Sequence, residues 1–236
     1  MAMSSKVPFA SPYYPYEKDT SGAFNGLKGA EFIPYKLLMY LLDLPDKYGY
    51  EPVDDNERPR VRLIKYLYYD DPNPLAQPLP TPEQKLSLVY NGENAQLDGD
   101  EDKANHPVGY RILPQIYTMP SELNARALLK CYMAREIPRN DYKTVLGVNF
   151  DITLNYALDN ITRTKAYSRM YAMHQCIVEA LHGVNIAGIG TVHYNKLIHG
   201  DCGYTLYHSE GTQIYSDTFM AIEWRETTEP EVVKAF

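Results

Sequence analysis

The clearest hydrophobic pattern in the chain is a strict alternation over residues 148–158, VNFDITLNYAL. Every second side chain is apolar, and most of the side chains between them are polar. Successive side chains of a strand point to opposite faces of a sheet, so the pattern predicts a strand with one buried face. The apolar positions are Val148, Phe150, Ile152, Leu154, Tyr156 and Leu158.

A helix and further strands are expected after this strand. Residues 163–182 place apolar side chains at helical spacing, and Gly183 follows where a C-terminal cap is expected. Strand-like sequence returns after the GIG segment at 188–190. Shorter strands are predicted at 204–208, 213–215 and 219–225, with a turn at 209–212. The glycines lie between a helix and a strand, so the geometry of a phosphate-binding loop is missing.

The first half of the chain gives shorter patterns. Residues 32–44 carry apolar side chains at helical spacing and predict an amphipathic helix. Residues 60–69 alternate and predict a strand, although Lys65 interrupts the apolar face. A short strand is expected at 86–90, before the Asn-Gly turn. Residues 110–117 predict an edge strand because Pro114 interrupts them.

Residues 121–136 allow two interpretations. Ser121 follows a proline and is typical of a helix N-cap, and Leu123, Ala127 and Leu128 then fit a helix. Residues 129–133 fit a strand equally well. Helix or strand therefore stays open for residues 127–135.

Several segments show no regular period. Residues 1–30 are rich in Ser, Pro, Gly and Tyr, residues 71–82 contain five prolines, and residues 91–105 are acidic and polar. Proline fixes φ and lacks a donor, so polyproline-like extension is expected at 71–82. We therefore expect an α+β fold, with a mixed or antiparallel sheet packed against one or two helices. Residues 31–226 would form one domain with a loop insertion at about 70–107, between an extended arm (1–30) and a tail (227–236).

Composition narrows the class of protein. The chain has 236 residues, a net charge of −7 and three cysteines without paired spacing. We expect reduced thiols, no membrane span, and a protein made in the cytosol. The negative charge argues against a protein that binds nucleic acid by neutralising phosphates. It is compatible with a surface past which DNA slides without being held.

Tyrosine is the compositional outlier, with 22 Tyr against 6 Phe and 1 Trp. Tyrosine suits interfaces because it combines a large contact area with a polar tip. The interface candidates are Tyr13, Tyr14, Tyr16 and Trp224. The alternatives remain that the rings fill the rims of the core and that the N-terminal segment is a disordered tail.

The strongest candidate for chemistry is a group of metal-ligating residue types, His193, His199, Cys202 and His208. Their spacing matches no usual zinc pattern and no CxxC accompanies them, so histidines scattered over strands and turns are the favoured interpretation. Asp98, Asp100 and Asp102 resemble the start of a calcium loop, but the required glycine and glutamate are replaced by Lys103 and Gly109. We expect no catalytic residue, metal or cofactor.

The order of elements over residues 145–226 resembles the tail-terminator and tail-completion (neck) proteins of long-tailed bacteriophages. These are small α/β proteins that cap the tail tube and join it to the head-proximal neck. The matching text is the strand VNFDITLNYAL, the helix RMYAMHQCIVEALHG, the strand after GIG and the strand TFMAIEWRE. The helix near 35–42 and the segment ALLKCYMARE match the early elements of that family. This chain is longer, through the proline-rich, acidic and tyrosine-rich segments.

The resemblance implies a structural virion protein of the neck or tail end. It implies a ring, commonly of six copies, that contacts the tail-tube protein and neck or connector proteins while genomic DNA passes through without specific binding. Two alternatives stay open. One is a small metal-dependent enzyme that uses residues 193–208, and the other is a generic adaptor module.

Overall fold

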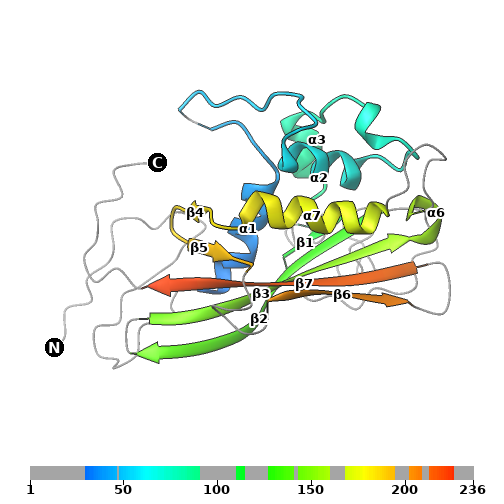
Figure 1. The fold of residues 1–236 in the computed structure, drawn as a ribbon. Coiled ribbons are helices and arrows are strands. Elements are labelled where there is room, and N and C mark those ends of the chain that lie inside the picture. Colours follow the sequence, from blue (N-terminus) through cyan, green and yellow to red (C-terminus); the bar gives the residue numbers. More distant parts are fainter. Residues whose placement is uncertain are drawn as a thin grey trace, which may run out of the picture.

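The computed structural model describes residues 30–46, 48–90, 110–114, 127–140, 143–159, 168–194, 202–208 and 213–225. A long twisted sheet carries its helices together on one side (Figure 1). The α+β class is therefore confirmed. Three helices of nine or more residues contact the sheet or one another, rather than the one or two expected: α1 (Ile33–Leu41), α2 (Pro59–Tyr68) and α7 (Arg169–Leu181).

The sheet is mixed but mostly antiparallel. Its order is β1-β2-β3-β7-β5-β4, and β6 also pairs with β7. Among the described strands, β1 and β2 are the only neighbours that run parallel to each other. The strands are β1 (Ile112–Leu113), β2 (Ala127–Asn140), β3 (Lys143–Asn155), β4 (Asn185–Ile186), β5 (Gly190–His193), β6 (Gly203–His208) and β7 (Gln213–Arg225).

The predicted alternation builds the centre of the sheet. Phe150 and Ile152 on β3 lie opposite Thr218 and Ser216 on β7, and all four are buried on the face that the helices cover. The strand is longer at its start than expected and ends at Asn155, because a short helix, α6 (Tyr156–Asp159), follows it. The two strands expected at 213–215 and 219–225 are one continuous strand, β7.

The helix α7 lies against β3 and begins at Arg169, later than the predicted start at residue 163. The Ser168 side chain caps its N-terminus by accepting a hydrogen bond from the Tyr171 amide at 3.3 Å. Gly183 follows the C-cap with φ +75°, a conformation that favours glycine, so the predicted stop is confirmed. The predicted helix at 32–44 is also present, as α1.

Residues 60–69 form the helix α2 rather than the predicted strand. Pro59 occupies the first turn, where its missing amide costs nothing. Val61, Leu63, Ile64, Lys65 and Leu67 are all buried, so the helix is covered around most of its circumference, and its buried positions fit an alternating pattern as well as a helical one. The Arg169 guanidinium donates to the carbonyls of Tyr66, Tyr69 and Asp71 and satisfies the C-terminal end of α2.

The proline-rich segment is also more ordered than polyproline-like extension implies. It contains the 3-10 helix η2 (Pro74–Ala76) and leads into α3 (Pro82–Ser87), which Thr81 and Gln84 start with a capping box. The predicted strand at 86–90 is therefore wrong, because Leu86 and Ser87 end α3. Val89 makes only an isolated bridge to Ile112.

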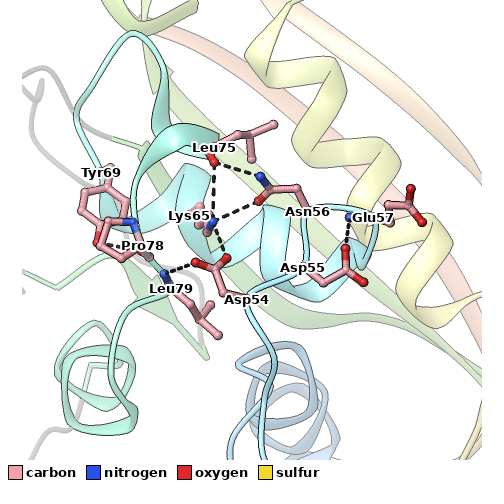
Figure 2. A network of polar contacts seen from close by, with 9 residues as sticks. All are labelled: Asp54, Asp55, Asn56, Glu57, Lys65, Tyr69, Leu75, Pro78 and Leu79. Carbon is pink, nitrogen blue, oxygen red and sulfur yellow. Dashed lines mark hydrogen bonds and ion pairs between the residues drawn. The ribbon is translucent and has the colours of Figure 1, made fainter.

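Lys65 joins the proline-rich segment to α2 (Figure 2). The side chain is only 2% exposed, and its Nζ lies 2.5 Å from Asp54 Oδ1 and 3.0 Å from Asn56 Oδ1. Asn56 Nδ2 donates to the Leu75 carbonyl at 2.9 Å, and Asp54 Oδ2 accepts from the Leu79 amide at 3.1 Å. The lysine that appeared to break a strand face is thus the buried centre of a polar network.

Residues 127–135 are strand, which settles the open alternative and excludes the helical interpretation for them. β2 pairs with β3 over its length, with register shifts at Met133/Arg135 and Pro138/Asn140. The predicted strand at 110–117 is present as β1 at an edge of the sheet, but only Ile112 and Leu113 belong to it.

Several predicted segments lie outside the described residues. They include Tyr13, Tyr14, Tyr16 and the rest of the arm up to residue 29, all of the acidic loop at 91–105, and the tail. Trp224 lies in β7 opposite Thr144, but its side chain is outside the description. No helix in the described ranges is long and apolar enough to cross a membrane.

Candidate functional site: the edges and outer face of the sheet

The β2 edge of the sheet is built in a way that discourages pairing with another strand. β1 pairs with β2 only at Leu129 and Lys130. Beyond them the strand carries a register shift next to Ala134, the exposed charged residues Arg135 and Glu136, and Pro138, which has no amide donor. Bulges, charges and prolines are devices that protect an edge strand from further pairing.

The β6 edge lacks these devices. β6 pairs with β7 from Gly203 to His208 in a continuous antiparallel register. In the part of the chain that the structure describes, no strand pairs with its other side. The strand GYTLYH contains no Asp, Glu, Lys, Arg or Pro. Thr205, Leu206 and Tyr207 are exposed, so the strand presents unpaired backbone groups flanked by uncharged side chains.

Exposed apolar side chains lie on both sides of the β6 edge. Leu206 is 43% exposed and Tyr207 is 48% exposed, on opposite faces of the strand. Tyr171 on α7 is 54% exposed, and its ring contacts that of Tyr204 on β6 at 5.9 Å between centroids. We call these four residues together the β6 edge patch. A strand that docked here would gain both backbone hydrogen bonds and apolar contacts.

The outer face of the sheet, opposite the helices, carries a polar row. Lys130, Asp151, Asp217 and Thr205 lie side by side on β2, β3, β7 and β6. Asp151 Oδ1 accepts from Asn149 Nδ2 at 2.6 Å and from the Tyr132 hydroxyl at 3.2 Å, and Asp151 also shares a hydrogen bond with Asp217. Two carboxyl groups in direct contact favour retention of a proton between them.

The pKa values of this row follow from that contact. Burial, together with the hydrogen bond to Asp217 and its charge, raises the pKa of Asp151 to about 7. Burial is also the main reason that the pKa of the Tyr132 hydroxyl is raised, to about 12. A hydrogen bond to Asp217 and its charge raise the pKa of Tyr207. The outer face can therefore change its charge near neutral pH, at Asp151.

The helix-covered face contains its own polar contacts. His174 Nδ1 lies 2.8 Å from Thr218 Oγ1, and Ser216 Oγ donates to Met170 Sδ at 3.0 Å. The His174 ring also lies against Tyr204, with centroids 4.2 Å apart. Burial lowers the pKa of His174 to about 4, so the ring is neutral at physiological pH. The contact between His174 and Tyr204 joins α7 to β6.

A pocket of about 350 Å³ lies between α2 and α7. Arg62 in its wall forms an ion pair with Glu179, and Gln175 donates to the same carboxylate at 2.8 Å. Burial raises the pKa of the Cys176 thiol to about 12, which keeps it protonated and unsuited to nucleophilic attack. The lining residues are Arg62, Tyr66, Leu75, Tyr171, Ala172, Gln175 and Cys176.

The predicted metal-ligating residues are not assembled into a site in the described part of the chain. Cys202 is buried and its thiol donates to the His193 carbonyl at 3.4 Å. His199 lies outside the described residues, as does the side chain of His208. Among the residues that are described, no group of three or more His, Cys, Asp and Glu is placed to hold a metal. The three cysteines are buried and unpaired.

Sequence reasoning missed the β6 edge patch and the carboxyl pair. The strand at 204–208 was predicted, and its lack of charge was a signal that it differs from an ordinary exposed strand. The unpaired side of β6 depends on the order of strands in space, which no local pattern encodes. Asp151 was placed on the polar face of its strand, but its partner Asp217 lies 66 positions further along the chain and required the β3–β7 register.

Comparison with known proteins identifies one family. The family model described as YomW matches residues 61–218, which is well over half of the chain. The match begins in α2 and ends in β7, so it includes the β2–β3 hairpin, α7 and all of β6. No curated protein matches the chain.

Proposed function

The chain belongs to the YomW family, a phage-derived family of Bacillus type, and from this premise we propose that it is a structural virion protein of a phage neck or tail end. It is a phage-associated protein. In our proposal it assembles into a ring, of six copies as the resemblance implies, that terminates the tail tube and joins it to the head-proximal connector. It does this by recognition and without catalysis.

The observation that carries the proposal is the contrast between the two edges of the sheet. One edge is protected by a bulge, charges and a proline, and the other presents uncharged β6, whose outer side pairs with no strand among the described residues. Natural proteins protect exposed edge strands because these would otherwise associate. An unprotected edge flanked by Leu206, Tyr207 and Tyr171 therefore supports a protein that functions in an assembly.

A closed ring needs two different complementary surfaces on each subunit. The β6 edge patch supplies one of them. The net charge of −7 supports a channel past which DNA moves without being bound. The partners in this proposal are further copies of the chain, the tail-tube protein and the neck or connector proteins.

The test is the assembly state of the full-length protein by native mass spectrometry and negative-stain electron microscopy. We expect rings in the wild type. Leu206→Lys should abolish them because it places a charge at the edge, whereas Leu86→Lys should leave them intact. Leu86 is 46% exposed on α3, close to the 43% of Leu206, so it is a matched control. A wild-type protein that remains monomeric and joins no tail or neck complex would refute the proposal.

A further inference from the structure

Among the described residues no strand pairs with the outer side of β6, so this edge can accept an added strand, and an uncharged one suits it. The β6 strand offers six residues of backbone, and the side chains beside it are Leu206, Tyr207 and Tyr171. A strand added to such an edge gains affinity from main-chain hydrogen bonds and specificity from alternate side chains. A matching segment must therefore be uncharged, apolar and able to present a donor at every second residue.

The chain contains such a segment before its first described residue. Residues 7–16 read VPFASPYYPY and contain no charged residue, with Lys6 before them and Glu17 after them. They supply Phe9, Tyr13, Tyr14 and Tyr16 as aromatic rings for apolar contact. This composition matches the uncharged β6 edge and contrasts with the charged edge of β2.

The positions of the prolines leave one side of this segment able to pair with a neighbouring strand. In a strand, the amide and carbonyl groups of every second residue point toward the same neighbouring strand. Val7, Phe9, Ser11 and Tyr13 form one such set, and each has an amide donor. Pro8 and Pro12 belong to the other set, where a missing donor faces solvent and is tolerated at an edge. Pro15 falls in the pairing set and would end the ladder.

The connection is long enough to reach a neighbouring subunit. Ala30 is buried, so the segment starts from a fixed point on the domain. Sixteen residues lie between Tyr13 and Ala30, and a fully extended chain spans about 55 Å from one to the other. A compact domain of about 200 residues has a diameter of roughly 40–45 Å. The segment can therefore cross the width of a subunit.

We propose that residues 7–13 of one copy pair as an added strand with the β6 edge of the next copy in the ring. This inference rests on the proposed function, since it supplies the second of the two different surfaces that a ring requires. The segment is one surface and the β6 edge patch is the other, so each subunit donates one strand and accepts one.

The first test uses two prolines in the same segment. Ser11→Pro removes a donor that faces β6, whereas Ala10→Pro removes one that faces away. We expect Ser11→Pro to raise the concentration at which rings dissociate by about tenfold, and Ala10→Pro to change it less than about twofold. Equal behaviour of the two variants would overturn the strand pairing. Because ring assembly itself stabilises the folded chain, the melting temperature is compared for dissociated protein, at concentrations below those that support rings, where both variants should match the wild type.

The second test places cysteines on the two surfaces in separate chains. Rings reassembled from a mixture of Ser11→Cys and Thr205→Cys chains should form a disulfide between positions 11 and 205, identified by peptide mass spectrometry. Leu86→Cys in place of Thr205→Cys should give none. Rings that form without the 11–205 link overturn this inference but leave the proposed function standing. If a Ser11→Cys/Thr205→Cys double variant instead forms the disulfide within one chain, the pairing between copies is also overturned. A wild-type protein that forms no rings refutes the proposed function itself.

Discussion

Asp151 on β3 and Asp217 on β7 face each other directly across the antiparallel ladder and share a hydrogen bond. Burial and this contact raise the pKa of Asp151 to about 7. In the unfolded chain an aspartate ionises near pH 4, so the folded state holds a proton that the unfolded state releases. The contribution of Asp151 to stability is therefore present below about pH 4 and is lost as the pH rises through about 7.

Replacing Asp151 with Asn should make the protein more stable at high pH. An Asn side chain can still accept from Asn149 and Tyr132 and can donate to Asp217, as the protonated carboxyl does. We expect the free energy of unfolding to rise by on the order of 1–3 kcal/mol at pH 8 and to change little at pH 4. Urea unfolding at the two pH values measures this. Glu57→Gln, which removes an exposed carboxylate, should show no such difference, and a loss of stability at pH 8 in Asp151→Asn would contradict the shared proton.

His174 should have the opposite pH dependence. Its pKa is lowered from 6.5 to about 4, so the unfolded chain takes up a proton near pH 6.5 that the folded chain does not. Stability is therefore lost as the pH falls from about 6.5 towards 4, by about 2 kcal/mol. His174→Phe keeps a ring against Tyr204 and removes the titration, so the difference in unfolding free energy between pH 7 and pH 4.5 should shrink. An unchanged slope would show that other groups dominate acid unfolding.

The close approach of Phe219 to Gly147 gives a prediction about the outer face. A Cβ atom at position 147 would lie 2.3 Å from Cζ of Phe219 and 3.2 Å from Cβ of Arg135. Gly147→Ala should therefore destabilise the protein by about 1–3 kcal/mol, because either the ring or the strands must move. Thermal unfolding measures the effect.

Removal of the Phe219 aromatic ring provides the control for the Gly147→Ala variant. In the Phe219→Ala background the added methyl group meets no ring, so Gly147→Ala should cost much less there than in the wild type. A double-mutant cycle isolates this interaction. Equal costs in the two backgrounds would assign the requirement for glycine to the backbone instead.

The sequence predicts the centre of the sheet because one face of β3 is apolar and the other polar. Phe150 and Ile152 alternate with Asn149 and Asp151, and only a strand separates these sets. The same reasoning failed at residues 60–69, where Leu63, Lys65 and Leu67 alternate within a helix that is buried on most sides. Val61, Ile64 and Lys65 also have helical spacing, so the segment fits both periods, and Pro59 in the first turn was a further indication of a helix.

The candidate surface was less accessible to sequence reasoning than the fold. Leu206 and Tyr207 lie in a strand that the pattern indicated, yet their importance comes from the absence of a paired neighbour among the described residues. That property belongs to the order of strands and not to the local sequence. By contrast, the local sequence does indicate that the β2 edge is protected. Arg135, Glu136 and Pro138 show this once residues 127–140 are known to form a strand.

Lys65 provides the last prediction, since it connects the proline-rich segment to α2. Lys65→Met keeps the apolar stem but removes the ammonium group from Asp54, Asn56 and the Leu75 carbonyl. The exposed Asn56 side chain and the Leu75 carbonyl then lose the buried ammonium donor that joins them, and we expect a loss of about 1–2 kcal/mol in unfolding free energy. Limited proteolysis should also cut residues 71–82 faster. Asp54→Asn keeps an oxygen acceptor for Lys65 on a side chain that is 44% exposed, so it should cost less than about 1 kcal/mol. If Lys65→Met instead matched the wild type in both measurements, the network would not be what holds the proline-rich segment on α2.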